Sequence, residues 1–218
     1  MKSSIIALAT AATFAAAFTA NADTSSPEWT YLQAGYAQLD VDGADEEPDG
    51  FGVEGSYLFN ENVFVRGRYQ KASEGESGYF DDWYSGTTIR YNYDADIELA
   101  SIALGYKTAL NDFSDFYATA SVERLKVSDS ETVVGYNSYS DSYSETGYGA
   151  SVGIKSRLSD MFELYGEAGY LKLDDFDISD ASFEAGANLY FTENFGAGVS
   201  YRKFDDVGIL GANIRYAF

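Results

Sequence analysis

Beyond an apolar N-terminal segment, the sequence alternates between apolar and polar side chains with a period of two almost to its last residue. This alternation is typical of β-strands that separate two different environments. No later run of apolar residues approaches the roughly 20 that a transmembrane helix requires. The pattern therefore predicts an all-β fold. The ten expected strands are Glu28–Leu39, Gly50–Phe59, Asn62–Ala72, Ile97–Ala109, Asp115–Val127, Thr146–Leu158, Phe162–Leu173, Ser179–Phe191, Phe195–Phe204 and Gly208–Phe218.

The N-terminal segment has the parts of a secretory signal peptide. Lys2 gives it a positive start, an apolar stretch follows, and Ala20 and Ala22 form the small-x-small pattern of a cleavage site. The alternative is a membrane anchor, for which the apolar stretch is shorter than the roughly 20 residues needed. We expect cleavage after Ala22, with residues 1–22 removed and residues 23–218 folding as a single domain.

The composition narrows the function classes that the chain can serve. It has no cysteine and no histidine, which removes disulfides, thiolate metal sites and the commonest general base. Acidic residues outnumber basic ones by 35 to 14, so nucleic acid, whose binding depends on basic surface, is not an expected partner. We therefore expect neither an enzyme nor a protein that depends on a cofactor or a metal.

The connections between the expected strands alternate between short and long. Short connections, such as residues 60–61 and 192–194, alternate along the chain with long or acidic ones, such as residues 40–49, 73–96 and 128–145. Outer-membrane barrels sort their connections in this way, with tight periplasmic turns and longer external loops. The sequence thus predicts a closed antiparallel up-and-down transmembrane β-barrel in the outer membrane of a Gram-negative bacterium. Ten strands are expected, with eight as the alternative because the last two external connections are brief.

The spacing of aromatic residues indicates which face of the barrel contacts lipid. Phe51 and Phe59, and likewise Phe183 and Phe191, stand eight residues apart on the apolar parity with smaller side chains between them. In a tilted strand this spacing spans roughly 20 Å, close to the apolar band between two aromatic girdles. A soluble core would instead have its largest side chains at its centre. The apolar parity is therefore expected to face outward.

The opposite parity carries charges, which we expect to line the lumen. Enclosed charges are costly unless paired, so Glu54 is expected to pair with Arg66 or Arg68, and Glu184 with Arg202 or Arg215. Most small barrels fill their interior with side chains, although a narrow ion-selective pore is the alternative. The expected lumen residues are Glu54, Arg66, Arg68, Lys107, Glu123, Lys155, Arg157, Glu163, Glu167, Glu184, Arg202 and Arg215.

The last strand alternates to the end of the chain, with Ile214, Tyr216 and Phe218 on its apolar parity. It resembles the terminal strand that the outer-membrane assembly machinery recognises. With these features, the mature chain resembles the small single-chain barrels of the OmpA, OmpX and opacity-protein kind. The resemblance implies a barrel in the outer membrane, and we expect no peptidoglycan-binding domain like that of OmpA-type proteins. Known barrel enzymes of this membrane use a histidine, which this sequence lacks.

The external connections concentrate acidic residues and tyrosines. An acidic run at residues 40–49 could offer oxygen ligands to Ca²⁺, but it lacks the EF-hand spacing, and a solvated anionic rim is expected. Tyr/Ser/Asn/Gly mixtures such as residues 135–144 suit contact surfaces, because tyrosine gives area at low entropic cost. The expected contact residues are Tyr79, Phe80, Trp83, Tyr84, Tyr136, Tyr139 and Tyr143.

Two functions remain open at this stage. The first is a structural or surface-interaction barrel, similar to an adhesin or receptor, that acts through its external loops. The second is a small porin-like channel with a narrow charged lumen. Either protein would be a monomer whose partners are outer-membrane lipid, lipopolysaccharide and the assembly machinery, together with an external ligand of unknown identity.

Overall fold

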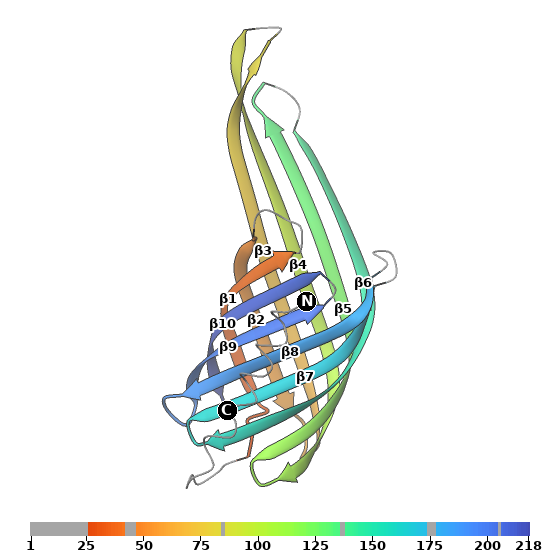
Figure 1. Cartoon of the computed structure of the whole chain (residues 1–218), viewed down its shortest axis with the longest axis vertical. Coiled ribbons are helices and arrows are strands. Elements are labelled where there is room, and N and C mark those ends of the chain that lie inside the picture. The colour runs from red at the N-terminus through yellow and green to blue at the C-terminus, as the bar shows by residue number, and fades with distance from the viewer. Residues whose placement is uncertain (1–25, 42–46, 84–85, 136–137, 174–177, 205) are drawn as a thin grey trace, which may run out of the picture.

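The computed structural model describes residues 26–41, 47–83, 86–135, 138–173, 178–204 and 206–218. The ten strands form one closed antiparallel barrel in which chain neighbours pair and β1 closes onto β10 (Figure 1). No helix in these ranges is long and apolar enough to cross a membrane. The strands are β1 (Tyr31–Val41), β2 (Asp49–Leu58), β3 (Val63–Asp82), β4 (Thr87–Asn111), β5 (Ser114–Val133), β6 (Tyr139–Ser159), β7 (Phe162–Leu173), β8 (Ile178–Tyr190), β9 (Phe195–Phe204) and β10 (Val207–Ala217).

The expected strand count of ten and the up-and-down topology are confirmed. Closure between β1 and β10 runs in register from Tyr31 opposite Ala217 to Val41 opposite Val207. Because every strand has a partner on both sides within the barrel, no backbone edge is left there to face hydrocarbon, which a lipid environment requires.

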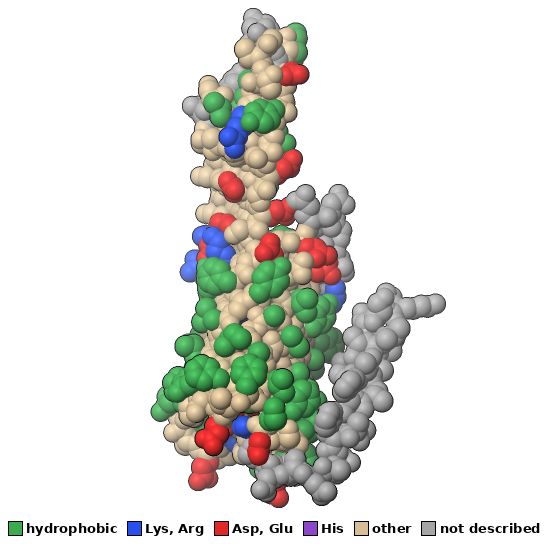
Figure 2. All heavy atoms as spheres, turned by 90° about the vertical axis from the view of Figure 1, so that its left-hand side faces the viewer, with side chains coloured by type: hydrophobic (Ala, Val, Ile, Leu, Met, Phe, Trp, Pro, Cys, Tyr) green, Lys and Arg blue, Asp and Glu red, His purple; other side chains and the backbone are tan. Residues whose placement is uncertain are grey.

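The barrel is apolar outside and polar inside, as the parity of the sequence predicts. Ile102 and Ile214 point outward, with 59% and 58% of their surfaces exposed, whereas Arg215 and Glu163 point inward, with 2% and 0% exposed. Figure 2 shows the outward apolar side chains as a band around the visible face, with charged groups at both of its limits. This arrangement is the reverse of a soluble protein, so the outer surface is suited to lipid.

Two short turns at the end opposite the long hairpins use the same structural solution. The side-chain oxygen of Asn60 accepts the backbone N–H groups of Asn62 and Val63, and Thr192 does the same for Asn194 and Phe195. The side-chain amides of Asn62 and Asn194 then each donate to a backbone carbonyl on a neighbouring strand. A residue with a short polar side chain thus ends each strand and fixes the turn.

Four strands are much longer than the sequence pattern predicts. The connections expected at residues 73–96 and 128–145 are wrong, because β3 pairs with β4 as far as Asp82 opposite Thr87, and β5 pairs with β6 as far as Glu131 opposite Tyr139. Ser73, Asp96, Ser128 and Ser142 lie in one row across the four strands. Above this row β3–β6 continue beyond the barrel as a curved sheet (Figure 1), here called the projection.

Two inward aromatic rings lie directly across inward glycines on the neighbouring strand. Phe64 is opposite Gly105, and Tyr117 is opposite Gly153. A Cβ atom on Gly105 would lie 2.2 Å from the Phe64 ring, and one on Gly153 would lie 2.5 Å from the Tyr117 ring. The glycines are therefore needed for close approach, which lets large rings fill the lumen without widening the barrel.

Candidate functional site

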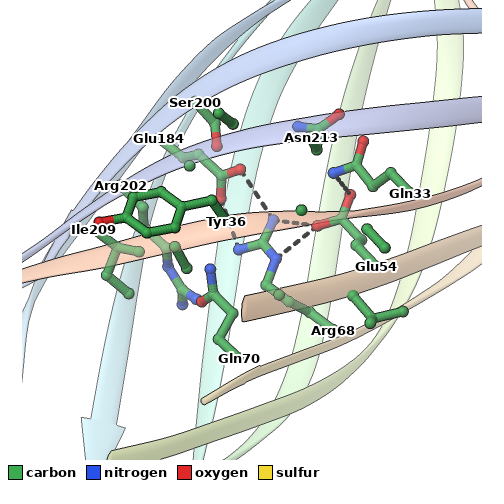
Figure 3. A pocket seen from close by; sticks show the side chains of 17 residues that line it. Gln33, Tyr36, Glu54, Arg68, Gln70, Glu184, Ser200, Arg202, Ile209 and Asn213 are labelled. Carbon is green, nitrogen blue, oxygen red and sulfur yellow. Dashed lines mark hydrogen bonds and ion pairs between the residues drawn. The ribbon is translucent and has the colours of Figure 1, made fainter. Parts of the chain in front are cut away.

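Arg68 on β3 lies at the centre of the lumen and joins opposite walls of the barrel. Its Nε donates to Glu54 Oε2 at 2.6 Å, and its two terminal nitrogens donate to the two Glu184 oxygens at 2.9 Å each. Glu54 also accepts the hydroxyl proton of Tyr31 at 2.7 Å. Figure 3 shows Arg68 between the two carboxylates, with Gln33 beside Glu54. Because β3 and β8 are not neighbours in the sheet, this contact spans the lumen.

Other ion pairs also cross between strands that are not adjacent. Arg66 on β3 contacts Glu167 on β7 at 2.9 Å, and Arg202 on β9 lies 3.9 Å from Glu123 on β5. The expected pairing of Glu184 with Arg202 or Arg215 is wrong, since Glu184 pairs with Arg68. Arg202 stands opposite Glu184 in register but directs its side chain elsewhere. The lumen is narrow enough for long side chains to reach across it, and register alone does not reveal this.

The turn end of the lumen contains a second polar cluster, centred on Glu163. This carboxylate contacts Arg215 at 3.0 Å and Lys155 at 3.3 Å, and accepts the backbone N–H of Glu28 at 2.9 Å. Arg157 pairs with the Glu28 side chain at 2.6 Å. The segment before β1 therefore folds into the lumen and completes this cluster.

Trp29 is a lumen residue that the sequence reasoning missed. Its indole N–H donates to Asp115 at 2.7 Å, and its ring packs on Phe64 and Tyr117 at centroid distances of 4.5 and 5.2 Å. Lys107 also pairs with Asp115, at 2.9 Å. The parity of Trp29, which matches that of the inward Tyr31, is the signal that could have revealed it.

The lumen is closed at the opposite end by apolar side chains. Leu39, Leu171, Phe204 and Ile209 are among the buried residues of a cluster inside the mouth. The cavities around the charged and aromatic residues below measure about 40, 30 and 20 Å³. A water molecule needs roughly 10–15 Å³ of such space, so each cavity accommodates only a few waters. Apolar, charged and aromatic layers thus fill the barrel from one end to the other.

The projection places the expected contact residues on two different faces. Phe80, Tyr139 and Tyr143 continue the inward parity of the barrel, whereas Tyr79 lies on the opposite face. Trp83, at the tip, has 90% of its surface exposed. Tyr91 and Tyr93 share the inner face and were not expected there. Tyr84 and Tyr136 lie outside the described residues.

Charged groups at the base of the projection are tied together on its outer surface. Lys71 contacts Asp96, and Lys126 contacts Glu98, at 2.9 Å each. A hydrogen bond from Ser73, followed in size by one from Lys71, lowers the pKa of Asp96. A hydrogen bond from Lys126, followed in size by one from Tyr69, lowers the pKa of Glu98. Both carboxylates therefore stay ionised as the pH falls to their ordinary range, and the pairs weaken only when the pH falls through the lowered pKa values.

The terminal strand directs its expected assembly residues toward lipid. Ile214, Tyr216 and Phe218 all point outward, and the Tyr216 ring lies 4.8 Å from the rings of both Phe195 and Phe218. The cleavage residues Ala20 and Ala22, and residues 42–46 of the acidic run at 40–49, lie outside the described residues. Within the described ranges, no group of three or more metal-ligating side chains comes together.

Several solved structures of outer-membrane proteins are similar to this chain. The structure of Ail from Yersinia pestis in complex with the heparin analogue sucrose octasulfate is 20% identical, covers 87% of this chain and 99% of its own, and gives a TM-score of 0.44. OprG from Pseudomonas aeruginosa is 12% identical over 91% and 100% of the two chains, with a TM-score of 0.42. The KdgM porin in complex with disordered oligogalacturonate is 10% identical over 86% and 99%, with a TM-score of 0.47.

A search of curated protein sequences gave no match. The family model for the outer membrane protein beta-barrel domain, however, matches residues 5–202. That match extends from the N-terminal apolar segment into β9, and so includes nine of the ten strands of the barrel at least in part. On this evidence the chain belongs to the family of outer membrane protein beta-barrel domains.

Proposed function

We propose that this outer-membrane barrel is a monomeric, non-catalytic surface protein that contacts an extracellular partner through the projection. The observation that carries the proposal is the continuation of β3–β6 beyond the barrel as a paired sheet. Paired strands hold their side chains in a fixed array, whereas a mobile loop would have to be ordered on binding, at an entropic cost. A preformed sheet is therefore a better contact surface than loops of the same composition.

One edge of the projection is open along β6. No described strand pairs with β6 before Tyr148, which lies opposite Lys172 on β7. The backbone N–H of Arg157 on β6 points toward β5, because it donates to the backbone carbonyl of Phe113, the residue directly before β5. The register between β5 and β6 then continues without a shift as far as Tyr139. Successive residues of an antiparallel strand direct their backbone N–H and C=O groups to opposite sides. Residues of β6 at odd positions, like Arg157, therefore bond to β5, and the backbone groups of Ser140, Ser142 and Ser144 point to the open side. Such an edge can accept a strand from another protein.

The charge of the projection indicates the chemistry of the partner. Asp129 and Asp141 lie opposite each other on the inner face, and like charges in this arrangement repel. Residues 74–95 and 129–141 contain Arg90 as their one basic residue, so a second copy of this chain is a poor partner. Their acidic residues are Glu74, Glu76, Asp81, Asp82, Asp94, Asp129, Glu131 and Asp141. An extended segment with basic side chains on one face fits best.

The filled lumen argues against the alternative function as a channel. Arg68 bridges Glu54 and Glu184 across the barrel, and an apolar cluster lies between this bridge and the mouth. An ion would have to displace paired charges and then cross buried apolar side chains, both of which are costly. The closed interior suits a barrel that serves as a support for its projection.

The experiment that tests the proposal compares two substitutions at one edge position. The whole protein, refolded in lipid nanodiscs, is titrated with a ten-residue peptide of alternating lysine and threonine. Ser142→Pro removes one edge-facing N–H without touching the bonds to β5, and Ser142→Ala alters only the side chain. We expect the proline variant to bind at least about ten times more weakly, and the alanine variant to bind like the wild type.

Unspecific attraction to the negative protein is the same in both variants, so charge alone cannot produce this difference. Equal binding by the proline variant and the wild type would show that the edge does not accept a strand. A second variant replaces residues 74–95 and 129–141 by Asn-Gly turns at the row of Ser73, Asp96, Ser128 and Ser142. If this shortened barrel binds the peptide as tightly as the full protein, the projection is not the contact surface.

A further inference from the structure

The basic residues on the outer surface of the barrel are gathered at one level. On three strands a lysine stands two residues after an outward tyrosine: Lys71 on β3, Lys172 on β7 and Lys203 on β9. On β5, Arg124 stands two residues after the outward Val122. Lys126 is two residues further along β5. All of these strands run toward the projection, so the cations lie where the apolar band ends and the acidic projection begins.

Among the residues that the structure describes, the opposite rim of the barrel carries no such cations. The short connections there contain Glu61, Asp112, Asp160 and Glu193, and no lysine or arginine. Apart from Arg90 on the projection, every basic residue in the described part of the chain lies either in the lumen or at this one level. The formal net charge of the chain is −21, and the basic residues on the outer surface of the barrel are concentrated at one boundary with lipid.

The densest part of this level spans β3, β4 and β5. Lys71, Glu98 and Lys126 lie in one row, and Tyr69, Ala100 and Arg124 lie in the row below. Ile102 and Val122, in the next row, are 59% and 52% exposed and face the acyl chains. Two of the three cations are partly neutralised by Asp96 and Glu98. Arg124 donates a 3.3 Å hydrogen bond to the neutral Ser144 hydroxyl, and no described carboxylate pairs with it.

We propose that Lys71, Arg124 and Lys126 form a binding site for the phosphate groups of lipid A in the outer leaflet. A guanidinium at the edge of an apolar surface can donate two hydrogen bonds to a phosphate, while acyl chains rest on the apolar rows below. Lysines on either side add attraction to anionic headgroups. Phospholipids offer the same phosphate chemistry, but the site lies at the extracellular rim, where lipid A is the lipid of the outer membrane.

The test uses the whole protein refolded in a zwitterionic detergent and titrated calorimetrically with three lipids. These are diphosphorylated lipid A, the same lipid A after enzymatic dephosphorylation, and phosphatidylglycerol. Arg124→Gln removes one charge from the site, and Arg90→Gln is a charge-matched control on the projection. We expect Arg124→Gln to weaken binding of phosphorylated lipid A by about ten-fold or more, and Arg90→Gln to change it by less than about two-fold.

Each outcome decides the matter. Tight binding that requires the phosphates, weakens in Arg124→Gln and is weaker for phosphatidylglycerol supports the site. Equal affinity for dephosphorylated lipid A, equal binding by Arg124→Gln and the wild type, or tighter binding of phosphatidylglycerol would overturn it. Lys126→Gln is a second variant, in case Arg124→Gln does not refold, and retention of a heat-dependent shift in gel mobility confirms that each barrel is folded.

Discussion

Among single residues, Arg68 makes the contact that holds opposite walls of the barrel together. We expect Arg68→Gln and Glu184→Gln each to destabilise the barrel, because the first leaves Glu54 and Glu184 without their shared cation and the second leaves Arg68 with Glu54 alone. Breaking a buried pair typically costs about 3–5 kcal/mol, and lumen water should reduce this. The double variant should cost at least about 1 kcal/mol less than the sum of the two single changes. Urea unfolding in lipid vesicles measures all three.

A matched cycle on Lys71 and Asp96 provides the control for this prediction. These two residues also lie 2.9 Å apart, but their side chains are 31% and 36% exposed. Exposed pairs contribute about 0–1 kcal/mol, so their coupling should be the smaller of the two. Additive effects of the Arg68 and Glu184 changes, within a few tenths of a kcal/mol, would show that the bridge across the lumen contributes nothing to stability.

Two glycines that look alike in the sequence have opposite surroundings. Gly105 lies under the Phe64 ring, whereas a Cβ atom on Gly166 would meet nothing within 4 Å. We expect Gly105→Ala to lower the free energy of unfolding by about 1–3 kcal/mol, because the ring must move. Gly166→Ala should be neutral or stabilising by up to about 1 kcal/mol, because it restricts the unfolded chain. Equal losses in urea unfolding would mean that the ring packing is not what constrains Gly105.

For whole elements, the sequence pattern predicted the strands of the barrel but not their continuation into the projection. Inside the membrane, Glu54 and Val53 must face different environments, so alternation is strong and the parity of the lumen charges named in the sequence analysis could be predicted. Above the row of Ser73 both faces of the sheet meet water, and polar residues such as Ser77, Ser130 and Ser140 give no apolar–polar alternation to detect. Backbone pairing alone extends these strands, and it leaves little trace in side-chain hydropathy.

The partners of the lumen charges were harder to predict than their parity. Register placed Arg68 opposite Glu54, and that pairing exists. It also placed Arg202 opposite Glu184, and that pairing does not form. The difference arises from the width of the closed barrel, which decides whether a side chain meets its neighbour or the far wall. Width depends on all ten strands together, and no single pair of strands reveals it.

We expect the outer-membrane assembly machinery to recognise the terminal strand β10, and this stays a prediction. Phe218→Ala should lower the amount of assembled protein in the outer membrane several-fold without changing export across the inner membrane. Leu210→Ala is the control, because Leu210 points outward from the same strand, at its other end, and is 51% exposed. Membrane fractionation with a heat-modifiability assay measures both variants. Normal levels of the Phe218 variant would contradict the assigned role of the last aromatic residue.

As a whole molecule, the barrel is closed by three successive layers of side chains. Phe204 and Ile209 belong to the apolar layer near the projection, Arg68 to the charged layer below it, and Trp29 and Phe64 to the aromatic layer at the turn end. Apolar packing, ion pairing and ring packing in turn hold these three layers. A filled interior of this kind fits the proposed role of the barrel as a support for its projection.

This layering leads to a prediction for planar bilayers. The wild-type protein should give no stable conductance steps. A variant that removes the central bridge of the charged layer (Glu54→Ser, Arg68→Ser and Glu184→Ser together) should remain closed, because the apolar and aromatic layers still exclude ions. Steps should appear only when Phe204→Ala and Trp29→Ala are added, since a continuous water path then becomes available. Each protein is first checked for heat-dependent gel mobility, so that current through unfolded material is not counted. Regular steps from the wild-type protein would show that the lumen opens in a bilayer, and would favour the channel over the surface-contact function.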